Sequence, residues 1–169
     1  MPPEITSARR ARRTDTKPPQ TAGDEKSVLL GFLDYLRDAV AAKAEGAPDP
    51  QVRTPGVPSG TSVLGLVKHL TAVEGSYFLG VDVRNWAATH RPAPGETPEE
   101  LFAAYRDVVR RANEVIATYD DLALPAPLPP RKTSAPSMRW LLVHMIEETG
   151  RHAGHADILR EQIDGATGR

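Results

Sequence analysis

The chain has 169 residues, enough for one domain with its own apolar core and too few for two domains of ordinary size. A net charge of −1 argues against a nucleic-acid-binding surface spread over the chain, and no apolar run approaches the ~20 residues of a membrane span. No apolar stretch of a secretory signal follows the basic N-terminus, so we expect a cytoplasmic protein. The absence of Cys excludes disulfides, thiolate metal ligands and a cysteine nucleophile, so any thiol chemistry needs a thiol from outside.

Residues 1–22 are rich in Pro and basic residues and contain almost no apolar side chain. Such a composition cannot bury enough surface to offset the entropy of ordering the chain. We therefore predict a disordered, unpacked tail over 1–22 and one folded domain over 23–169. A cluster of four tail arginines would suit an acidic partner, but a solvated tail is the simpler interpretation.

Three helices are predicted before the C-terminal one, near residues 24–44, 62–79 and 98–119. Asp24 is a suitable N-cap for the first helix, and Leu and Val residues at helical spacing give that helix one apolar face. The second helix follows a turn rich in Pro, Ser and Gly. The third begins at Thr97, an N-cap followed by Pro and by a Glu that completes a capping box.

Two connections are predicted to be irregular because of their Pro and Gly content. Residues 80–96 form the first, which we expect to line the mouth of a pocket. Within it, Trp86 is expected to pack over the end of the bundle and His90 to be exposed. Residues 120–137 carry five Pro and are predicted to form a partly extended loop.

The last helix, predicted over 137–163, carries the most informative pattern. His144, Glu148, His152 and His155 follow one another at steps of four, four and three, in the same sector as apolar residues. Burying an unpaired polar group costs roughly 2–7 kcal/mol, and a charge costs more. A metal ion would offset this cost, since side chains at i and i+4 can share one cation. A buried structural polar network is the alternative interpretation.

The second predicted helix carries His69 on the same face as its apolar residues, and this adds an imidazole in the interior. Four helices without a strand pattern or an internal repeat predict an all-α, antiparallel four-helix bundle. Metal sites in bundles are built in the core from side chains of facing helices. His69, Glu148 and His152 therefore form a candidate site of two His and one carboxylate, with open coordination positions as in catalytic zinc sites.

Two segments resemble a known family: PSGTSVLGLVKHL around His69, and RWLLVHMIEETGRHAGHADILRE around Glu148 and His152. The sequence is similar to the DinB-like superfamily, and within it to the mycothiol-dependent S-transferases and maleylpyruvate isomerases. The similarity extends over most of the chain after about residue 24. It implies a divalent metal held by His69, Glu148 and His152, usually zinc, with Ni²⁺ or Fe²⁺ as alternatives.

The resemblance further implies a metal-dependent S-transferase that joins an external low-molecular-weight thiol, such as mycothiol, to a small electrophile. His155 and His144 are the candidate catalytic residues. Either could accept the thiol proton or orient a metal ligand, and we favour the second role for both. Asp157, Arg151 and Arg160 are expected to form surface ion pairs. We expect small-molecule partners, no nucleic acid and no membrane, and a monomer or homodimer.

Two other functions fit the same ligands. The metal could serve stability alone in a scaffold or interaction protein, in which case chelation would unfold the helices and no thiol would be turned over. Two His and one carboxylate also suit Fe(II) in non-haem oxygenases, although that chemistry usually occurs on other folds.

Overall fold

Four long helices form the body of the computed structural model, which describes residues 16–20 and 23–167. They are α1 (Glu25–Ala44), α2 (Val63–Leu79), α4 (Pro98–Ala117) and α5 (Met138–Asp164), and each begins and ends within two residues of its predicted bounds. Two shorter elements have no counterpart in the prediction: the 3₁₀ turn η1 (Gln51–Arg53) and the one-turn helix α3 (Trp86–Thr89). The predicted all-α bundle is confirmed.

Local capping explains the helix bounds. Four side chains each accept a hydrogen bond from a backbone N–H of the first turn of a long helix: Asp24, Ser62, Thr97 and Ser137. The two helices that carry the candidate site end at Gly80 (φ 67°) and Gly165 (φ 74°). This left-handed conformation favours glycine, because it carries no Cβ penalty there.

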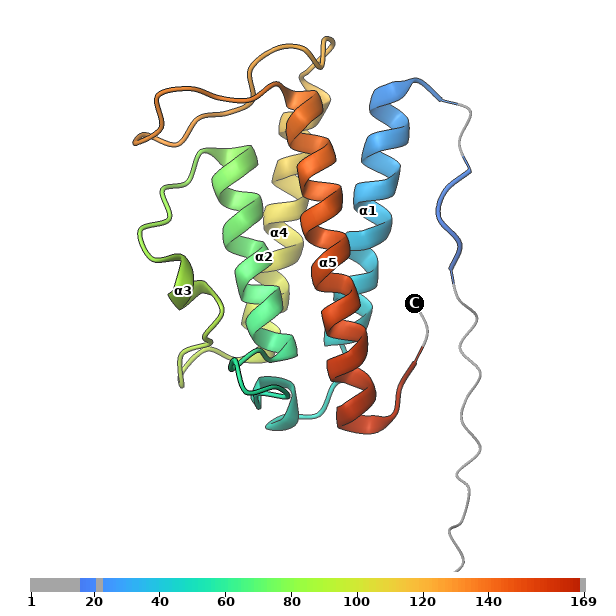
Figure 1. The fold of residues 1–169 in the computed structure, drawn as a ribbon, viewed down its shortest axis with the longest axis vertical. Coiled ribbons are helices and arrows are strands. Elements are labelled where there is room, and N and C mark those ends of the chain that lie inside the picture. The colour runs from blue at the N-terminus through green and yellow to red at the C-terminus, as the bar shows by residue number, and fades with distance from the viewer. Residues whose placement is uncertain (1–15, 21–22, 168–169) are drawn as a thin grey trace, which may run out of the picture.

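The helices pair as α1 with α5 and α2 with α4, and both pairs run parallel (Figure 1). Near the starts of α1 and α5, Glu25 lies 2.7 Å from Arg139, and near their ends Lys43 lies 2.7 Å from Asp157. The predicted antiparallel order holds for the loop-connected pairs α1/α2 and α4/α5 and is wrong for these two main pairs. The reason is the crossover, residues 80–97, which is long enough to return the chain along α2 before α4 begins.

Two buried cations tie the end of α1 to α5. The Lys43 side chain is almost completely buried, and its ammonium forms an ion pair with Asp157. The Arg160 guanidinium donates to the backbone carbonyls of Lys43 (2.8 Å) and Glu45 (3.0 Å), which have no partner inside α1. The expectation of surface ion pairs is therefore wrong for Arg160, which is buried, and incomplete for Asp157, whose partner is buried. Arg151 is exposed, as expected.

Two apolar clusters fill the bundle, one toward each end. A polar cluster within the bundle joins α1, α2 and α4, and its centre is the buried pair of Arg37 and Glu74. Both oxygens of Glu74 accept from the Arg37 guanidinium, at 2.8 and 2.6 Å. The remaining Arg37 nitrogen donates to Asp34 (2.8 Å) and to Asn113 (2.7 Å). Each charge in this cluster has an opposite charge as its neighbour.

Most of the tail predicted over residues 1–22 lies outside the described residues. The described part, residues 16–20, runs along α1, where the Tyr35 hydroxyl donates to the backbone carbonyl of Thr16 at 3.0 Å. A Cβ added at Gly31 would lie 3.2 Å from Pro19, so this glycine lets the segment approach the helix. Four of the five residues 16–20 are exposed, and the unpacked tail over 1–22 stays a prediction. Among the described helices, none has both the length and the apolar character that crossing a membrane requires.

Candidate metal centre

Three side chains from two helices converge where α2 faces α5. His69 comes from α2, and Glu148 and His152 come from α5. Oε1 of Glu148 lies 3.0 Å from Nε2 of His152 and 3.4 Å from Nε2 of His69. One potential ligand atom from each residue lies within 4.8 Å of the others. Two ligands about 2.1 Å from a shared tetrahedral zinc are roughly 3.4 Å apart, so one ion fits among these atoms.

The crossover fixes the tautomer of His69. Nδ1 of His69 lies 2.8 Å from the hydroxyl of Thr89, and this hydroxyl lies 2.6 Å from the backbone carbonyl of Trp86. A carbonyl can only accept, so the single hydroxyl proton of Thr89 goes to Trp86. The Thr89 oxygen must then accept from Nδ1–H of His69. In neutral His69 the other nitrogen, Nε2, consequently presents a lone pair toward Glu148.

The other two members of the trio also have outer partners. Nδ1 of His152 faces Nδ1 of His155 at 3.4 Å, while Nε2 of His152 faces Glu148. The second carboxylate oxygen of Glu148 accepts from Arg151 at 3.2 Å. Metal-binding His and carboxylate side chains in proteins are commonly held by outer hydrogen bonds of this kind.

The protonation states of the trio suit a metal. Burial, followed by the neighbouring His90, lowers the pKa of His69 to about 4, and burial also lowers the pKa of His152. Burial alone would raise the pKa of Glu148, but His152, His69 and Arg151 outweigh it, and this pKa falls below its usual value. Near neutral pH the site therefore holds two neutral imidazoles and one carboxylate, the states that bind metal.

The lone pair of His69 and the anionic oxygen of Glu148 are both acceptors, and they face each other at 3.4 Å. Two acceptors at this distance repel unless a proton or a cation lies between them. The pKa of His69 disfavours the proton near neutral pH. The donor set of this chain therefore fits a cation, and a divalent metal is the cation that two imidazoles and a carboxylate bind.

The crossover covers the site on the side of α2. The ring of His90 stacks on that of His69, with centroids 3.8 Å apart, and Trp86 meets His69 edge-on at 6.1 Å. A Cβ at Gly65 would lie 2.3 Å from the carbonyl oxygen of His90, so only glycine allows this approach. The prediction that His90 is exposed is wrong, because the crossover presses its ring onto α2. Trp86 was predicted to cover the end of the bundle, and in the structure it lies beside His69.

The two predicted catalytic residues, His155 and His144, have different surroundings. His155 is exposed and contacts His152. His144 is half-buried between Trp140, which stacks on it at 4.9 Å, and Tyr77, which meets it edge-on at 5.3 Å. None of the described interactions of His144 involves the trio. The polar side chains of α5 lie at the edge of the buried face of that helix. Apolar residues such as Met145 occupy the centre of the buried face.

Residues 28–165 match the sequence model of the mycothiol-S-transferases. The chain belongs to the mycothiol-S-transferase family. The match runs from the first turn of α1 to the end of α5 and includes the whole trio. It confirms the resemblance carried by the two motifs. No relative was found among curated proteins.

Membership in the mycothiol-S-transferase family decides between the three functions that fit the ligands. Its members are enzymes that transfer a thiol, and the family implies mycothiol and an electrophile as the substrates. This favours the S-transferase over the scaffold and over the iron oxygenase. Sequence analysis missed Thr89 and His90, which lie in the crossover and follow no helical period. The one signal for them was Gly65, a costly residue inside a helix, which often marks a close backbone approach.

Proposed function

We propose that this protein transfers the sulfur of mycothiol to a small electrophile, at a divalent metal bound by His69, Glu148 and His152. The observation that carries the proposal is the pair of opposed acceptors, the lone pair of His69 and the carboxylate of Glu148. A side-chain cluster built for structure alone would place a donor, and not a lone pair, at the position of His69. The lack of Cys requires that the sulfur come from the thiol substrate.

Zinc is the metal that we propose. Two imidazoles and one carboxylate are borderline ligands that suit zinc, and they leave open positions for a substrate. The same ligands accept Ni²⁺ and Fe²⁺, and metal analysis of the purified protein distinguishes the three. A divalent metal held there would lower the pKa of a bound thiol, so that its sulfur reacts as a thiolate near neutral pH.

The chain's own residues orient the site and shield it. Thr89 and His155 hold the two imidazoles from outside, so that both Nε2 atoms point toward Glu148. In the reaction, a carbon–sulfur bond forms, the leaving group departs from that carbon with its electron pair, and the thiol proton passes to water. We assign His155 to orienting His152, and His144, with Tyr77 and Trp140, to one wall of the site. Burial, and then the charge of Glu148, raises the pKa of Tyr77, so its phenol stays protonated.

A coupled rate and metal measurement tests the proposal. The purified protein should hold about one zinc ion per chain. The zinc-loaded protein should conjugate mycothiol to monobromobimane well above the spontaneous rate, and omission of the thiol should abolish the reaction. His152→Ala should bring the rate down to the spontaneous one. Equal rates for zinc-loaded wild type and metal-free His152→Ala, across several thiols, would refute the enzyme function.

We further propose that the protein acts in the cytoplasm as a monomer or homodimer. Light scattering of the purified protein measures the oligomeric state, and a mass above that of two chains would contradict this.

A further inference from the structure

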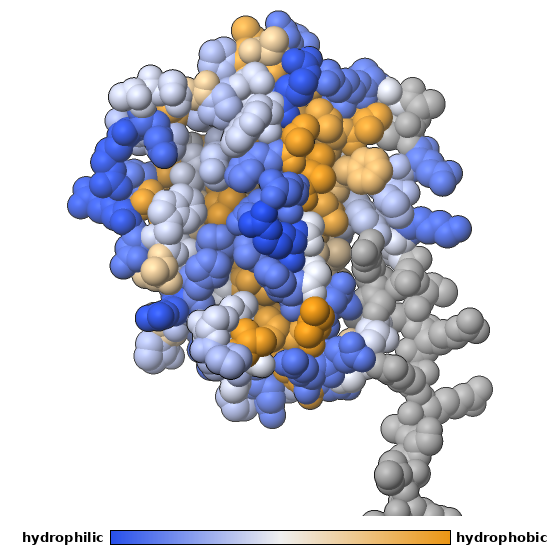
Figure 2. Space-filling view, viewed as in Figure 1, coloured by the Kyte–Doolittle hydropathy of each residue, from blue (hydrophilic) through white to orange (hydrophobic). Residues whose placement is uncertain are grey.

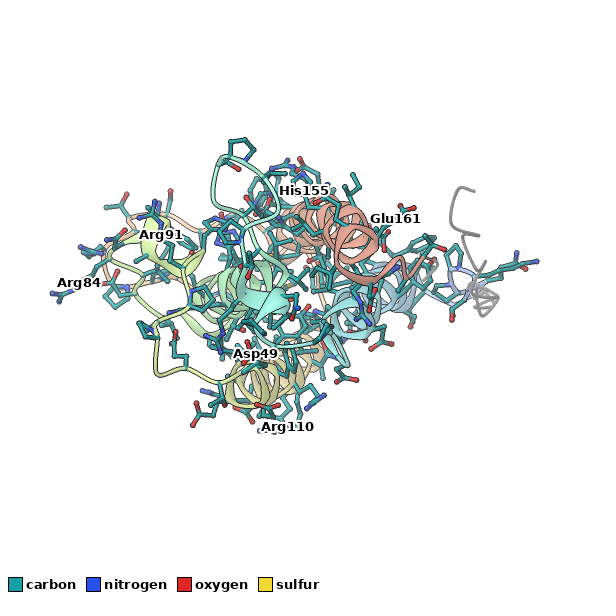
Figure 3. The ribbon with its side chains drawn as sticks, turned by 90° about the horizontal axis from the view of Figure 1, so that it is seen from below. Asp49, Arg84, Arg91, Arg110, His155 and Glu161 are labelled. Carbon is teal, nitrogen blue, oxygen red and sulfur yellow. The ribbon has the colours of Figure 1, made fainter. Side chains whose placement is uncertain are left out.

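Two cavities border the loop of residues 54–62, which Figure 3 shows between the labelled His155 and Arg91. Six residues line the larger of the two, of about 360 Å³: Val57, Ser59, Thr61, His155, Ile158 and Leu159. Six residues also line the smaller, of about 250 Å³: Ser59, Gly60, Thr61, Ala87, His90 and Arg91. Ser59 and Thr61 belong to both walls, so the loop is a partition with one cavity on each side.

The wall of each cavity contains a histidine that contacts one imidazole of the trio. His155, in the wall of the larger cavity, lies edge-on to His152 with ring centroids 5.5 Å apart. His90, in the wall of the smaller, stacks on His69. The two cavities therefore flank the trio, each one histidine side chain away from it.

The two cavities differ in chemistry. No charged side chain lines the larger one, and its apolar walls are open to solvent, since Ile158 is 59% exposed and Val57 37% exposed. Figure 2 shows apolar surface low on this face of the molecule. The smaller cavity is lined by Arg91, which forms no ion pair with any described residue, while the hydroxyl residues Ser59 and Thr61 are common to both cavities.

The larger cavity is preformed. Backbone hydrogen bonds close the loop on itself, from the N–H of Gly56 to the carbonyl of Thr61 and from the N–H of Gly60 to that of Val57, both at 3.0 Å. A Cβ at Gly56 would lie 2.4 Å from Cδ2 of Leu159, so the loop rests directly on α5. A fixed wall needs no ordering when a ligand binds, which favours binding.

We propose that the larger cavity is the electrophile subsite and that it selects uncharged electrophiles carrying an apolar group about the size of a ring system. This inference rests on the proposed function and names its second substrate. A cavity of this volume falls in the range of small-molecule sites, and an apolar wall penalises a charged group that it cannot pair. Mycothiol is a sugar conjugate rich in hydroxyls, and the smaller cavity, which adds the charged donor Arg91, suits it better.

Two matched electrophiles test the selectivity. Monobromobimane is a neutral bicyclic bromide, and its trimethylammonio analogue has the same rings and a positive charge. In both, sulfur binds the bromomethyl carbon as bromide leaves. We expect the zinc-loaded wild type to prefer the neutral compound in kcat/KM by roughly tenfold or more. An equal or reversed preference would overturn the inference.

Filling the cavity tests its location. Ile158→Trp should lower kcat/KM for monobromobimane roughly tenfold or more and change that for the small iodoacetamide less than about twofold. Val143→Trp is the matched control, since Val143 lies on the same helix with 52% exposure and about 22 Å away along its axis. If the Trp variant fails to fold, Ile158→Ala replaces it. The loss in kcat/KM should again be larger for monobromobimane than for iodoacetamide. Equal losses for both electrophiles, or none, would contradict the assignment.

An equilibrium measurement separates this inference from the proposed function. Unreactive dimethylbimane should bind the zinc-loaded wild type and Val143→Trp, and its binding should be lost in Ile158→Trp. Absence of binding in the wild type, or equal binding in all three proteins, would overturn the cavity assignment. Absence of mycothiol-dependent turnover with every electrophile would instead refute the proposed function, whatever the bimane binding shows.

Discussion

Two polar clusters share helix α2 and differ in how their charges are met. Glu74 is completely buried, and both of its oxygens accept from the guanidinium of Arg37. Five residues earlier on the same helix, the lone pair of His69 faces the carboxylate of Glu148. His152 contacts the same carboxylate oxygen. The first cluster is complete within the protein. The second has two acceptors facing each other, His69 and Glu148, and in the proposed function a cation would complete it.

The difference gives a physical criterion for reading buried polar groups. Burial is common to both clusters and does not distinguish them. What distinguishes them is the balance of donors and acceptors, because a balanced group stabilises one arrangement and an unbalanced one binds a ligand. The following predictions test that contrast, from the largest expected effect to the smallest.

Glu74→Ala should break the balanced cluster. It leaves the guanidinium of Arg37 buried without its main partner, and removing one partner of a buried pair typically costs about 3–5 kcal/mol. Urea unfolding of the metal-free protein should show this loss in the free energy of unfolding. The exposed Glu147→Ala is the control, with an expected change within about 0.5 kcal/mol. A loss below about 1 kcal/mol for Glu74→Ala would show that the cluster is not structural.

His152→Ala should break the unbalanced cluster without unfolding the protein. With only three protein ligands sharing the binding free energy, zinc affinity should fall by a factor of about 100 or more. Competition with a chromogenic chelator measures this affinity. Urea unfolding of the metal-free variant should differ from wild type by roughly 1 kcal/mol, since the apolar stripes supply most of the burial. A large loss of stability with unchanged zinc affinity would reverse the roles of the two clusters.

Thr89→Val tests whether the crossover sets the tautomer of His69. Val has nearly the shape of Thr but cannot accept from Nδ1–H, so Nε2 is no longer kept as the lone pair. Zinc affinity should fall roughly 10–100-fold, and Thr89→Ser, which restores the hydroxyl, should recover most of it. Similar affinities for the Val and Ser variants would mean that the hydroxyl has no part in orienting His69.

His155→Ala should have the smallest effect, about tenfold in zinc affinity, because His155 is exposed and its contact with His152 is long. His144→Ala is the matched control on the same helix and should leave the affinity unchanged. Chelator competition on both variants decides between them. A larger effect from His144 than from His155 would show that the outer partner of the trio has been misassigned.

Helical periodicity and capping residues were enough to predict the four long helices and the convergence of His69, Glu148 and His152. A period of 3.6 residues fixes the sector in which a side chain lies but not its depth or its neighbours. It therefore could not separate His155, which meets His152, from His144, which meets Trp140 and Tyr77.

The parallel pairing of helices could not be predicted from local patterns either. An 18-residue connection reaches a neighbouring helix from either end of the bundle. Thr89 and His90 lie in that connection, where no period applies. Arg160 was misplaced for a related reason: besides Asp164, four residues on, it binds backbone carbonyls at the end of α1, and no sequence pattern marks these.

The parallel pairing of α1 with α5 sets the time at which the chain can mature during synthesis. The main partner of the first helix is the last one, so α1 remains without it until residues 138–164 have left the ribosome. Contacts of such wide sequence separation slow folding, since a long loop must close before they form. Two of the three candidate ligands lie on α5, so a chain cut short before residue 138 would contain only His69 of the trio. In the proposed function, metal capture would therefore wait for completion of the polypeptide, because partial products lack the trio.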